Sequence, residues 1–175
     1  KEFGLFYGFK VTEITAQEVG DVAVSSTKIR SALEKGAIKV ANQFLGYNFM
    51  LNGTVVKGKG LGKTIQFPTA NLKITESYKL IPKKGVYLVK SIINSKSVYG
   101  MLNIGTNPTV SESNEISVEV FFFDFSQILY GISLNIQFLD GIRDEIKFPG
   151  LKALKEQLHL DQLAALAKID LLSKN

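Results

Sequence analysis

A glycine-rich segment with interspersed lysines, residues 53–64, has a composition that suits phosphate binding. Its sequence is GTVVKGKGLGKT. Glycines let backbone N–H groups approach an anion closely, and lysines add positive charge. A P-loop would need glycine where Lys57 stands, and both the P-loop and the dinucleotide fingerprint need a following helix, which is not predicted because Phe67-Pro68 comes almost at once. The segment is therefore a phosphate-binding loop of another kind or a mobile surface loop.

The next segment, Phe67–Leu72 (FPTANL), places a hydroxyl and a carboxamide two residues apart. In extended backbone Thr69 and Asn71 point to the same side, and Pro68 favours extended structure around it. Two neutral oxygen donors suit a hard cation such as Mg²⁺, which keeps water ligands and also binds nucleotide phosphates. The spacing fits a side-chain-closed turn after proline as well, and taken alone it favours that turn.

Three further side chains are candidates for chemistry. Glu119 lies in an alternating segment on the face that carries aromatic residues, where a partly desolvated carboxylate makes a better general base; otherwise it is an ordinary strand residue. Arg143 follows the last strand-like segment and can hold a phosphate or stack on a planar ring, or else pair with Asp144 or Glu145. The single histidine, His159, is expected at the surface of the helical tail.

The region that must position these residues, 48–140, has the pattern of several short β-strands. Alternating or β-branched runs occur at residues 54–56, 86–93, 98–104, 116–125 and 134–139, separated by turn signals. Such spacing predicts a small barrel or sandwich.

Helical patterns flank this region on both sides. Ser25-Ser26-Thr27 precedes apolar residues at helical spacing up to Gly36, and a second short helix is expected at 38–45, ended by Gly46. The tail, 148–172, carries an apolar stripe that is expected to pack on the barrel, with a break after which Asp161 caps a second helix.

Composition excludes several classes of protein. The chain has 175 residues, of which 45% are hydrophobic and 21% charged, as in ordinary globular proteins. It contains no cysteine, which excludes disulfides and cysteine-ligated metals and fits a reducing, cytoplasmic setting. No apolar run approaches the length of a membrane span. The net charge of +5 favours anionic ligands without demanding nucleic acid.

Six motifs in order make the chain resemble the riboflavin kinase family, and more fully the C-terminal part of bacterial bifunctional riboflavin kinase/FMN adenylyltransferases (FAD synthetases). The resemblance runs from about Val24 to Leu171. The motifs are the glycine segment leading into FPTANL, PKKGVY at 82–87, NIGTNPT at 103–109, VEV leading to FDF at 118–125, LYG at 129–131, and IRDE at 142–145 running to Phe148.

The resemblance implies a mainly β fold: a six-stranded Greek-key barrel with a C-terminal helix, preceded by a short α/β remnant. It implies a kinase that transfers the ATP γ-phosphate to the 5′-hydroxyl of riboflavin, giving FMN and ADP. Carried over residue by residue, it assigns Mg²⁺ to Thr69 and Asn71, catalysis to Glu119 and a flavin contact to Arg143. The ATP contacts it implies are Gly58, Gly60, Gly62, Lys63, Phe122, Asp124 and Tyr130. The family usually has glycine just before FPTAN, and this chain has Gln66, which bears on how the loop is shaped.

Residues 1–47 resemble the end of the adenylyltransferase domain, and 48–175 the kinase domain. Ser25, Ser26, Thr27 and Arg30 match a nucleotide-binding motif at a helix N-terminus. The partner motif with its histidine is missing, so the chain looks like a fragment that forms FMN but not FAD. Its expected partners are riboflavin and ATP, with no nucleic acid or membrane, and by itself the fragment is expected to be monomeric.

Two other functions stay open. One is a flavin- or nucleic-acid-binding barrel without catalysis, which leaves the Pro-Thr-Ala-Asn segment and Glu119 unexplained. The other is an intact FAD-forming enzyme.

Overall fold

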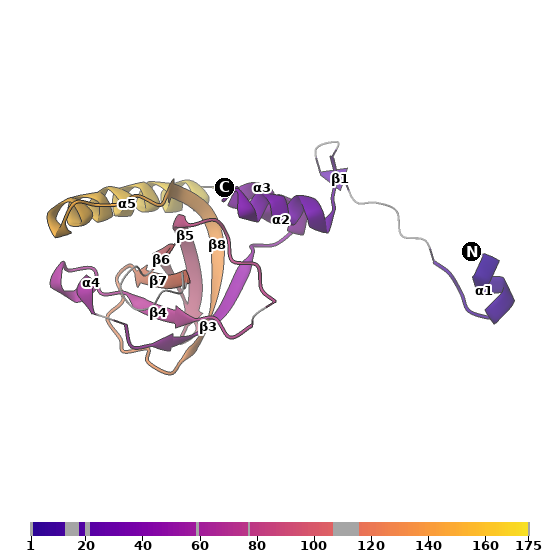
Figure 1. The fold of residues 1–175 in the computed structure, drawn as a ribbon, viewed down its shortest axis with the longest axis horizontal. Helices are drawn as coiled ribbons and strands as arrows, with labels where there is room; N and C mark the ends of the chain where they lie inside the picture. The colour runs from indigo at the N-terminus through magenta and orange to yellow at the C-terminus, as the bar shows by residue number, and fades with distance from the viewer. Residues whose placement is uncertain are drawn as a thin grey trace.

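The structure is a computed structural model, and it describes residues 2–12, 18–19, 22–58, 60–76, 78–106 and 116–174. A short helix α1 (Glu2–Tyr7) and a two-stranded ladder of β1 (Glu18–Val19) and β2 (Val22–Ala23) precede the main body. The rest is a barrel with one long helix, a pair of short helices and a single helical turn (Figure 1).

Six antiparallel strands close into a barrel in the order β3-β4-β7-β6-β5-β8. The strands are β3 (Met50–Val56), β4 (Ala70–Lys73), β5 (Gly85–Ile93), β6 (Lys96–Thr106), β7 (Ile116–Phe122) and β8 (Ser133–Asp144). The hairpin-connected strands β5, β6 and β7 are flanked by β8 beside β5 and β4 beside β7, which is Greek-key order. The six-stranded barrel that the family resemblance implied is confirmed.

The structure differs from the sequence prediction at several elements. β3 begins at Met50, four residues before the predicted start, and β7 ends at Phe122, three residues before the predicted end. β4 was not predicted as a strand, although extended backbone was expected there. β8 continues to Asp144, five residues beyond the predicted end, and pairs with β5 across two register shifts. A four-residue helix α4 (Leu61–Thr64) follows the glycines, where no helix was predicted. This turn ends at once, because Phe67 N–H donates to the Gly62 carbonyl at 2.8 Å.

The two helices before the barrel form as predicted. α2 (Ser26–Glu34) begins after Ser25, whose hydroxyl accepts from the Lys28 N–H, and α3 (Ile38–Leu45) ends at Gly46 with a left-handed φ of 75°. Their apolar residues join the same buried cluster as the barrel interior. α2 and α3 therefore pack as part of the barrel's own core.

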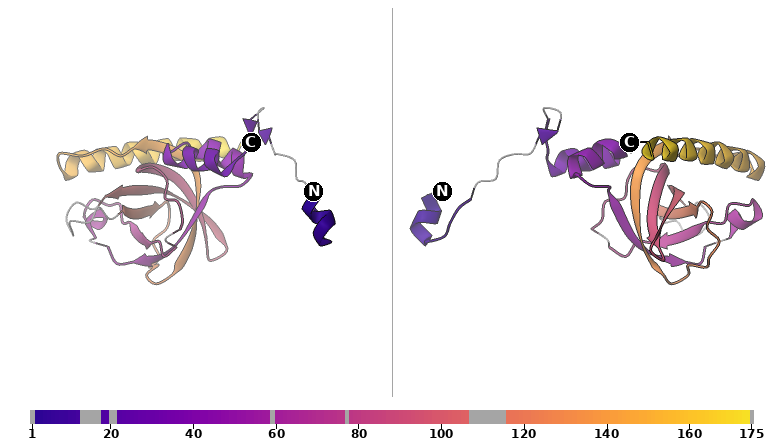
Figure 2. Two further views of the ribbon diagram at one scale, coloured as in Figure 1. Left: turned by 45° about the vertical axis from the view of Figure 1, so that its right-hand side comes forward. Right: turned by 180° about the vertical axis from the view of Figure 1, so that it is seen from behind.

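The C-terminal helix α5 (Leu151–Leu172) is a single helix of 22 residues. The predicted break before Asp161 is wrong: Asp161 lies in mid-helix and is buried, since an ion pair with Arg143 satisfies its carboxylate. α5 lies along one side of the barrel, and α2 and α3 lie near its C-terminal end (Figures 1 and 2). No helix among the described residues has the length and apolarity that crossing a membrane requires.

Alternation along the strands divides the apolar residues between two cores. On β7, Val118, Val120 and Phe122 belong to the barrel interior, whereas Phe121 packs with a second cluster on the barrel's outer face. That outer cluster includes Ala165 of α5, with Leu154 and Leu158 packed against it. Glu119, on the outer face with Phe121, is thereby directed away from the interior.

Candidate active site

A cavity of about 690 Å³ lies on the outer face of the barrel, between the glycine-rich segment, α4 and the first turns of α5. Its walls combine apolar side chains with a few polar groups, as ligand sites commonly do. The lining residues are Val56, Lys57, Gly58, Gly60, Gly62, Ile65, Phe67, Thr69, Asn71, Val86, Met101, Asn103, Glu119, Phe121, Arg143, Glu145, Ile146, Phe148, Leu154 and Leu158.

The floor of this cavity is one row of residues across neighbouring strands. Asn71 is opposite Glu119, Glu119 opposite Asn103, Asn103 opposite Val86, and Val86 opposite Arg143. Residues directly opposite each other share one face of a sheet. The row therefore brings five residues, separated by up to 72 positions in sequence, onto a single surface.

Thr69 and Glu119 meet at one end of the row. The Thr69 hydroxyl donates a hydrogen bond to Oε2 of Glu119 at 2.9 Å. A hydroxyl has one hydrogen to donate and two lone pairs, so Thr69 can orient the carboxylate and still offer its oxygen to a cation. The predicted metal ligands and the predicted general base thus converge on one point.

Gly58 packs directly against the carboxamide of Asn71. A Cβ added at residue 58 would lie 2.1 Å from Nδ2, 2.5 Å from Cγ and 2.9 Å from Oδ1 of Asn71. Only glycine leaves the carboxamide where it is. The glycine-rich segment is thereby held beside the hydroxyl–carboxamide pair.

The segment then turns back on itself through residues of unusual conformation. Gly60 has φ +75°, and Gln66 has φ +68°, in the left-handed region that favours glycine. This conformation is consistent with the glycine that the family resemblance led us to expect at the position of Gln66. Here the Gln66 side chain accepts a hydrogen bond from Lys155 Nζ of α5 at 2.9 Å, which links the loop to that helix.

The oxygen donors at this end suit a hard divalent cation. Thr69 and Asn71 offer neutral oxygens beside the Glu119 carboxylate, the kind of ligand that Mg²⁺ takes together with water and phosphate. The described residues contain no cluster of three or more His, Cys, Asp or Glu that would hold a metal without help. A cation here would take its remaining ligands from water and a bound phosphate.

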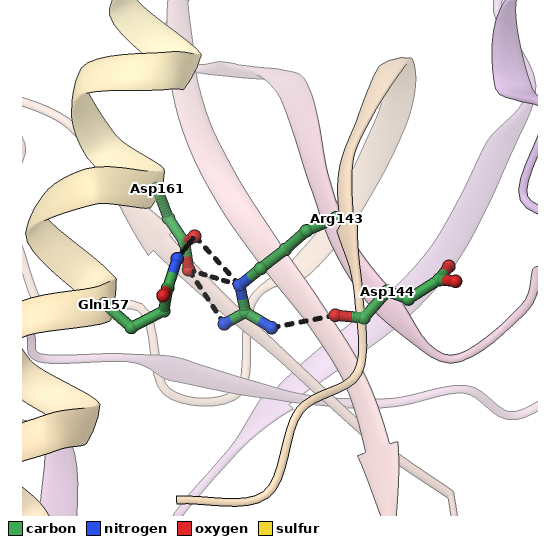
Figure 3. A network of polar contacts seen from close by, with 4 residues as sticks. All are labelled: Arg143, Asp144, Gln157 and Asp161. Atoms are coloured by element: carbon green, nitrogen blue, oxygen red, sulfur yellow. Dashed lines mark hydrogen bonds and ion pairs between the residues drawn. The ribbon is translucent and has the colours of Figure 1, made fainter.

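Arg143 closes the other end of the row in a bidentate ion pair (Figure 3). Its Nε and Nη2 donate to the Asp161 carboxylate at 2.8–3.0 Å, and Nη1 donates to the Asp144 carbonyl oxygen at 2.9 Å. Gln157 Nε2 also donates to Asp161, at 2.9 Å. The guanidinium lies over the Phe148 ring, 5.6 Å from its centre. Arg143 lines the cavity, as predicted for a ligand contact, but its charge is already paired.

Several predicted site residues lie outside the cavity. Phe122 is 5% exposed and belongs to the barrel interior, Asp124 lies in an exposed turn, and Tyr130 is 49% exposed beyond that turn. Their assignment as ATP contacts therefore has no support from the cavity and depends on the family resemblance alone. The backbone of Lys63 lies in α4, and its side chain lies outside the described part of the structure.

The residues assigned to an adenylyltransferase remnant are also separate from this cavity. Ser25 caps α2, and Ser26, Thr27 and Arg30 are exposed in its first turns. α2 and α4 lie on opposite sides of the barrel in Figure 1. His159 is exposed, as expected, and its ring meets the edge of Phe67 with 5.0 Å between ring centres.

The structure places three polar residues at or next to the cavity that were not among the candidate site residues predicted from the sequence. Asn103 faces the cavity between the buried residues Leu102 and Ile104, and a polar residue at that place in an apolar strand was a usable signal. Glu145 lines the cavity beyond Arg143. Asp161 was noted only as a possible cap, although it occupies the same helix stripe as Leu154, Leu158 and Ala165.

The family comparison and the curated relatives both indicate one family. The family description that matches, over residues 45–169, is riboflavin kinase (Flavokinase). Bifunctional riboflavin kinase/FMN adenylyltransferases from Listeria monocytogenes and Bacillus subtilis are 42% and 40% identical, over 88% and 89% of this chain and 49% of each relative. The chain thus spans about half the length of these curated relatives.

A solved structure shares the fold over nearly the whole chain. It is described as a macrolide-efflux protein from Streptococcus pneumoniae, with a TM-score of 0.84 and 33% identity. The similarity covers 94% of this chain and 53% of that one.

Proposed function

Since this chain belongs to the riboflavin kinase family, we propose that it transfers the γ-phosphate of ATP to the 5′-hydroxyl of riboflavin, giving FMN and ADP. The observation that carries the proposal is the hydrogen bond between Thr69 and Glu119 in the floor of the cavity. It places a proton acceptor within reach of the oxygens that suit a phosphate-bound cation. Phosphoryl transfer depends on such positioning and on charge neutralisation more than on covalent catalysis.

Glu119 acts as the general base in this proposal. In the reaction, the riboflavin 5′-oxygen forms a bond to the γ-phosphorus, the bond from that phosphorus to the bridging oxygen of ADP breaks, and the hydroxyl proton passes to Glu119. The bond from Thr69 engages Oε2 and fixes the plane of the carboxylate. In this proposal the other carboxylate oxygen, Oε1, takes the proton of the substrate hydroxyl.

Thr69 and Asn71 hold Mg²⁺ through their side-chain oxygens in this proposal. When bound with ATP, the cation neutralises charge on the transferred group. Gly58 allows Asn71 to keep its position, and Thr69 remains oriented by its bond to Glu119.

We place ATP phosphates along the glycine-rich segment and riboflavin along the row towards Arg143. Gly58, Gly60 and Gly62 line the cavity and present backbone to a ligand, with Lys57 beside them and Lys63 in the following turn. Three strand-to-strand steps separate Glu119 from Arg143, about 14 Å at the usual strand spacing. That span suits a sugar-alcohol chain with its hydroxyl at Glu119 and a planar ring system near Arg143 and Phe148.

The activity of a longer parent protein is a separate proposal. The names of the relatives include a second activity, FMN adenylyltransferase. From the sequence, residues 1–47 resemble the end of the domain responsible for that activity. We propose that this chain forms FMN without forming FAD, and that it acts as a monomer in the cytoplasm on small molecules only, without nucleic acid or membrane.

The deciding experiment incubates the chain with riboflavin, ATP and Mg²⁺ and separates FMN from FAD by chromatography. FMN as the only product is expected. FAD would support the longer activity, and neither product would support a binding module.

The matched variant is Glu119→Gln, which keeps the size of the side chain and its ability to accept from Thr69 but cannot take a proton. We expect kcat to fall by about 10²–10⁴-fold with little change in ATP affinity, as for other general bases. Glu156→Gln, on the exposed side of α5, is the control and should leave kcat unchanged. Near-normal turnover by Glu119→Gln would remove Glu119 from the mechanism.

A further inference from the structure

The Asp161 carboxylate, which lies just behind the cavity wall, accepts hydrogen bonds from two residues. Asp161 is 2% exposed in the middle of α5. It accepts from Arg143 through two nitrogens and from Gln157 through a third. A buried carboxylate is costly unless it is paired in this way, so the pair has one well-defined geometry.

This pairing decides what Arg143 can offer to a ligand. The edge of the guanidinium formed by Nε and Nη2, the fork that usually grips a phosphate, faces Asp161 (Figure 3). Nη1 is directed to the Asp144 carbonyl, and Cζ lies over the Phe148 ring, 5.6 Å from its centre. The side chain therefore presents a planar, charge-paired surface instead of a free cation.

We propose that Asp161 is a positioning residue for the riboflavin end of the cavity. It holds Arg143 and Phe148 as a flat wall for an uncharged ring and keeps the arginine charge from binding phosphate at the wrong end. This inference rests on the proposed function and extends it to a residue that does not line the cavity. It predicts that Asp161 affects the KM for riboflavin and not the KM for ATP.

The competing explanation is that Asp161 only anchors α5 to the barrel. A second ion pair between the same two elements provides the comparison. Lys168 of α5 pairs with Asp140 of β8, and neither residue lines the cavity. If Asp161 only anchored α5, breaking either ion pair would lower Tm and change the two KM values in the same way.

The experiment compares Asp161→Asn with Lys168→Gln in the full chain. Steady-state kinetics with each substrate varied in turn give both KM values and kcat, and thermal unfolding gives Tm. Both variants should lower Tm. Asp161→Asn should raise the KM for riboflavin about tenfold and the KM for ATP by less than twofold, whereas Lys168→Gln should change neither, since a small misplacement of a positioning group is enough to cost this much.

Two further variants test the inference if Asp161→Asn folds poorly. Gln157→Met removes one neutral hydrogen bond to Asp161 and should raise the KM for riboflavin severalfold. In an Arg143→Gln background, Asp161→Asn should add no further change in that KM, because its effect acts through Arg143. Riboflavin binding followed by flavin fluorescence should show the same order of affinities.

An unchanged riboflavin KM in Asp161→Asn, or an equal rise in both KM values, would overturn the inference while leaving the kinase function standing. A parent chain that forms no FMN would instead overturn the proposed function, and this inference with it.

Discussion

Thr69 joins the two halves of the proposed chemistry in a single side chain. Its hydrogen goes to the Glu119 carboxylate, and its oxygen remains available to a cation. Asn71, on the neighbouring strand position opposite Glu119, adds a second neutral oxygen. Because the site supplies few metal ligands of its own, bound ATP should raise the affinity for the metal, and the bound metal should raise the affinity for ATP.

Thr69→Ala should therefore raise the Mg²⁺ concentration needed for half-maximal activity, by about tenfold, since a carboxylate-poor site depends on each of its oxygens. The control is Thr69→Ser, which keeps the hydroxyl and should stay near the parent value. Titration of kinase activity with Mg²⁺ at saturating ATP measures the effect. Coincident titrations of the alanine variant and the parent chain would contradict the metal assignment.

Tyr87 provides a residue-scale link between burial and pH. It is buried in the barrel interior, its hydroxyl donates to the Lys83 carbonyl, and burial, helped by the Asp144 carboxylate, raises its pKa to about 12 from the ordinary 10.0. Since the pKa is higher in the folded state, the stabilising contribution is complete below pH 10. It is lost between pH 10 and 12, and a shift of two pKa units corresponds to at most about 3 kcal/mol.

Tyr87→Phe should consequently show a shallower fall in stability between pH 9 and pH 11 than the parent chain. Urea unfolding at the two pH values gives the comparison, and Tyr47→Phe, at an exposed tyrosine, is the control. Parallel pH dependence in the parent and Tyr87→Phe would show that Tyr87 does not titrate with unfolding.

At the scale of elements, the site is one surface of the barrel, formed by segments that lie far apart in the sequence. The glycine segment contributes five lining residues, β4, β5, β6, β7 and the end of β8 contribute one or two each, and α5 covers the apolar part. Contact between the segment and β4 depends on the absence of a side chain at residue 58.

Gly58→Ala should displace the Asn71 carboxamide, because its new Cβ would overlap three atoms of that group. We expect kcat/KM for ATP to fall at least tenfold with little loss of stability, since a side chain and not the backbone must move. Gly150→Ala is the matched control: no atom lies within 4 Å of a Cβ there, and its φ of 178° is extended. Equal activities of the two variants would contradict this packing argument.

Local patterns predict the elements of this fold better than the contacts between them. The alternation predicted for residues 116–125 is confirmed over 116–122, and the caps at Ser25 and Gly46 are confirmed, because period and turn chemistry are local properties. β4 was overlooked because four residues after a proline are too few to show a period. Asp161 was expected to begin a helix because aspartate commonly caps one, but its ion pair with Arg143, 18 positions away, keeps it inside α5.

The candidate site was predictable where a motif is contiguous and unpredictable where it is not. Thr69, Asn71, Glu119 and the glycines were all selected from sequence, and all line one cavity. Phe122, Asp124 and Tyr130 follow Glu119 along the chain but do not line the cavity. Phe122 points to the opposite face of β7, and the chain leaves the strand in a turn at Asp124.

At the scale of the whole molecule, α2 and α3 belong to the same core as the barrel. Ala32, Leu33, Ile38 and Ala41 are buried in the cluster that contains Leu51 and Phe138. Asn42 adds hydrogen bonds to the Phe138 carbonyl and from the Phe49 N–H. α2 and α3, which the sequence analysis expected to belong to a remnant of another domain, are therefore a structural part of the barrel domain.

A chain beginning at residue 48 should accordingly be much less stable than a chain beginning at residue 22, which keeps α2 and α3. Burial of Leu33 and Ile38 alone accounts for about 3–6 kcal/mol. Urea unfolding of the two truncated chains and the full chain measures the difference. Equal midpoints for the two truncations would show that the barrel does not need the helix pair.

The alternation along β7 has a consequence for how this sequence can change. Side chains along β7 point alternately into the barrel interior and towards the cavity. Residues that stabilise the core and residues of the proposed site therefore occupy adjacent positions of one strand. A single-residue deletion between the β6–β7 connection and Glu119 would shift the strand by one place and exchange the two faces. Glu119 would then point into the apolar barrel interior, and Val120 would face the cavity. Insertions and deletions should therefore be far less tolerated here than substitutions.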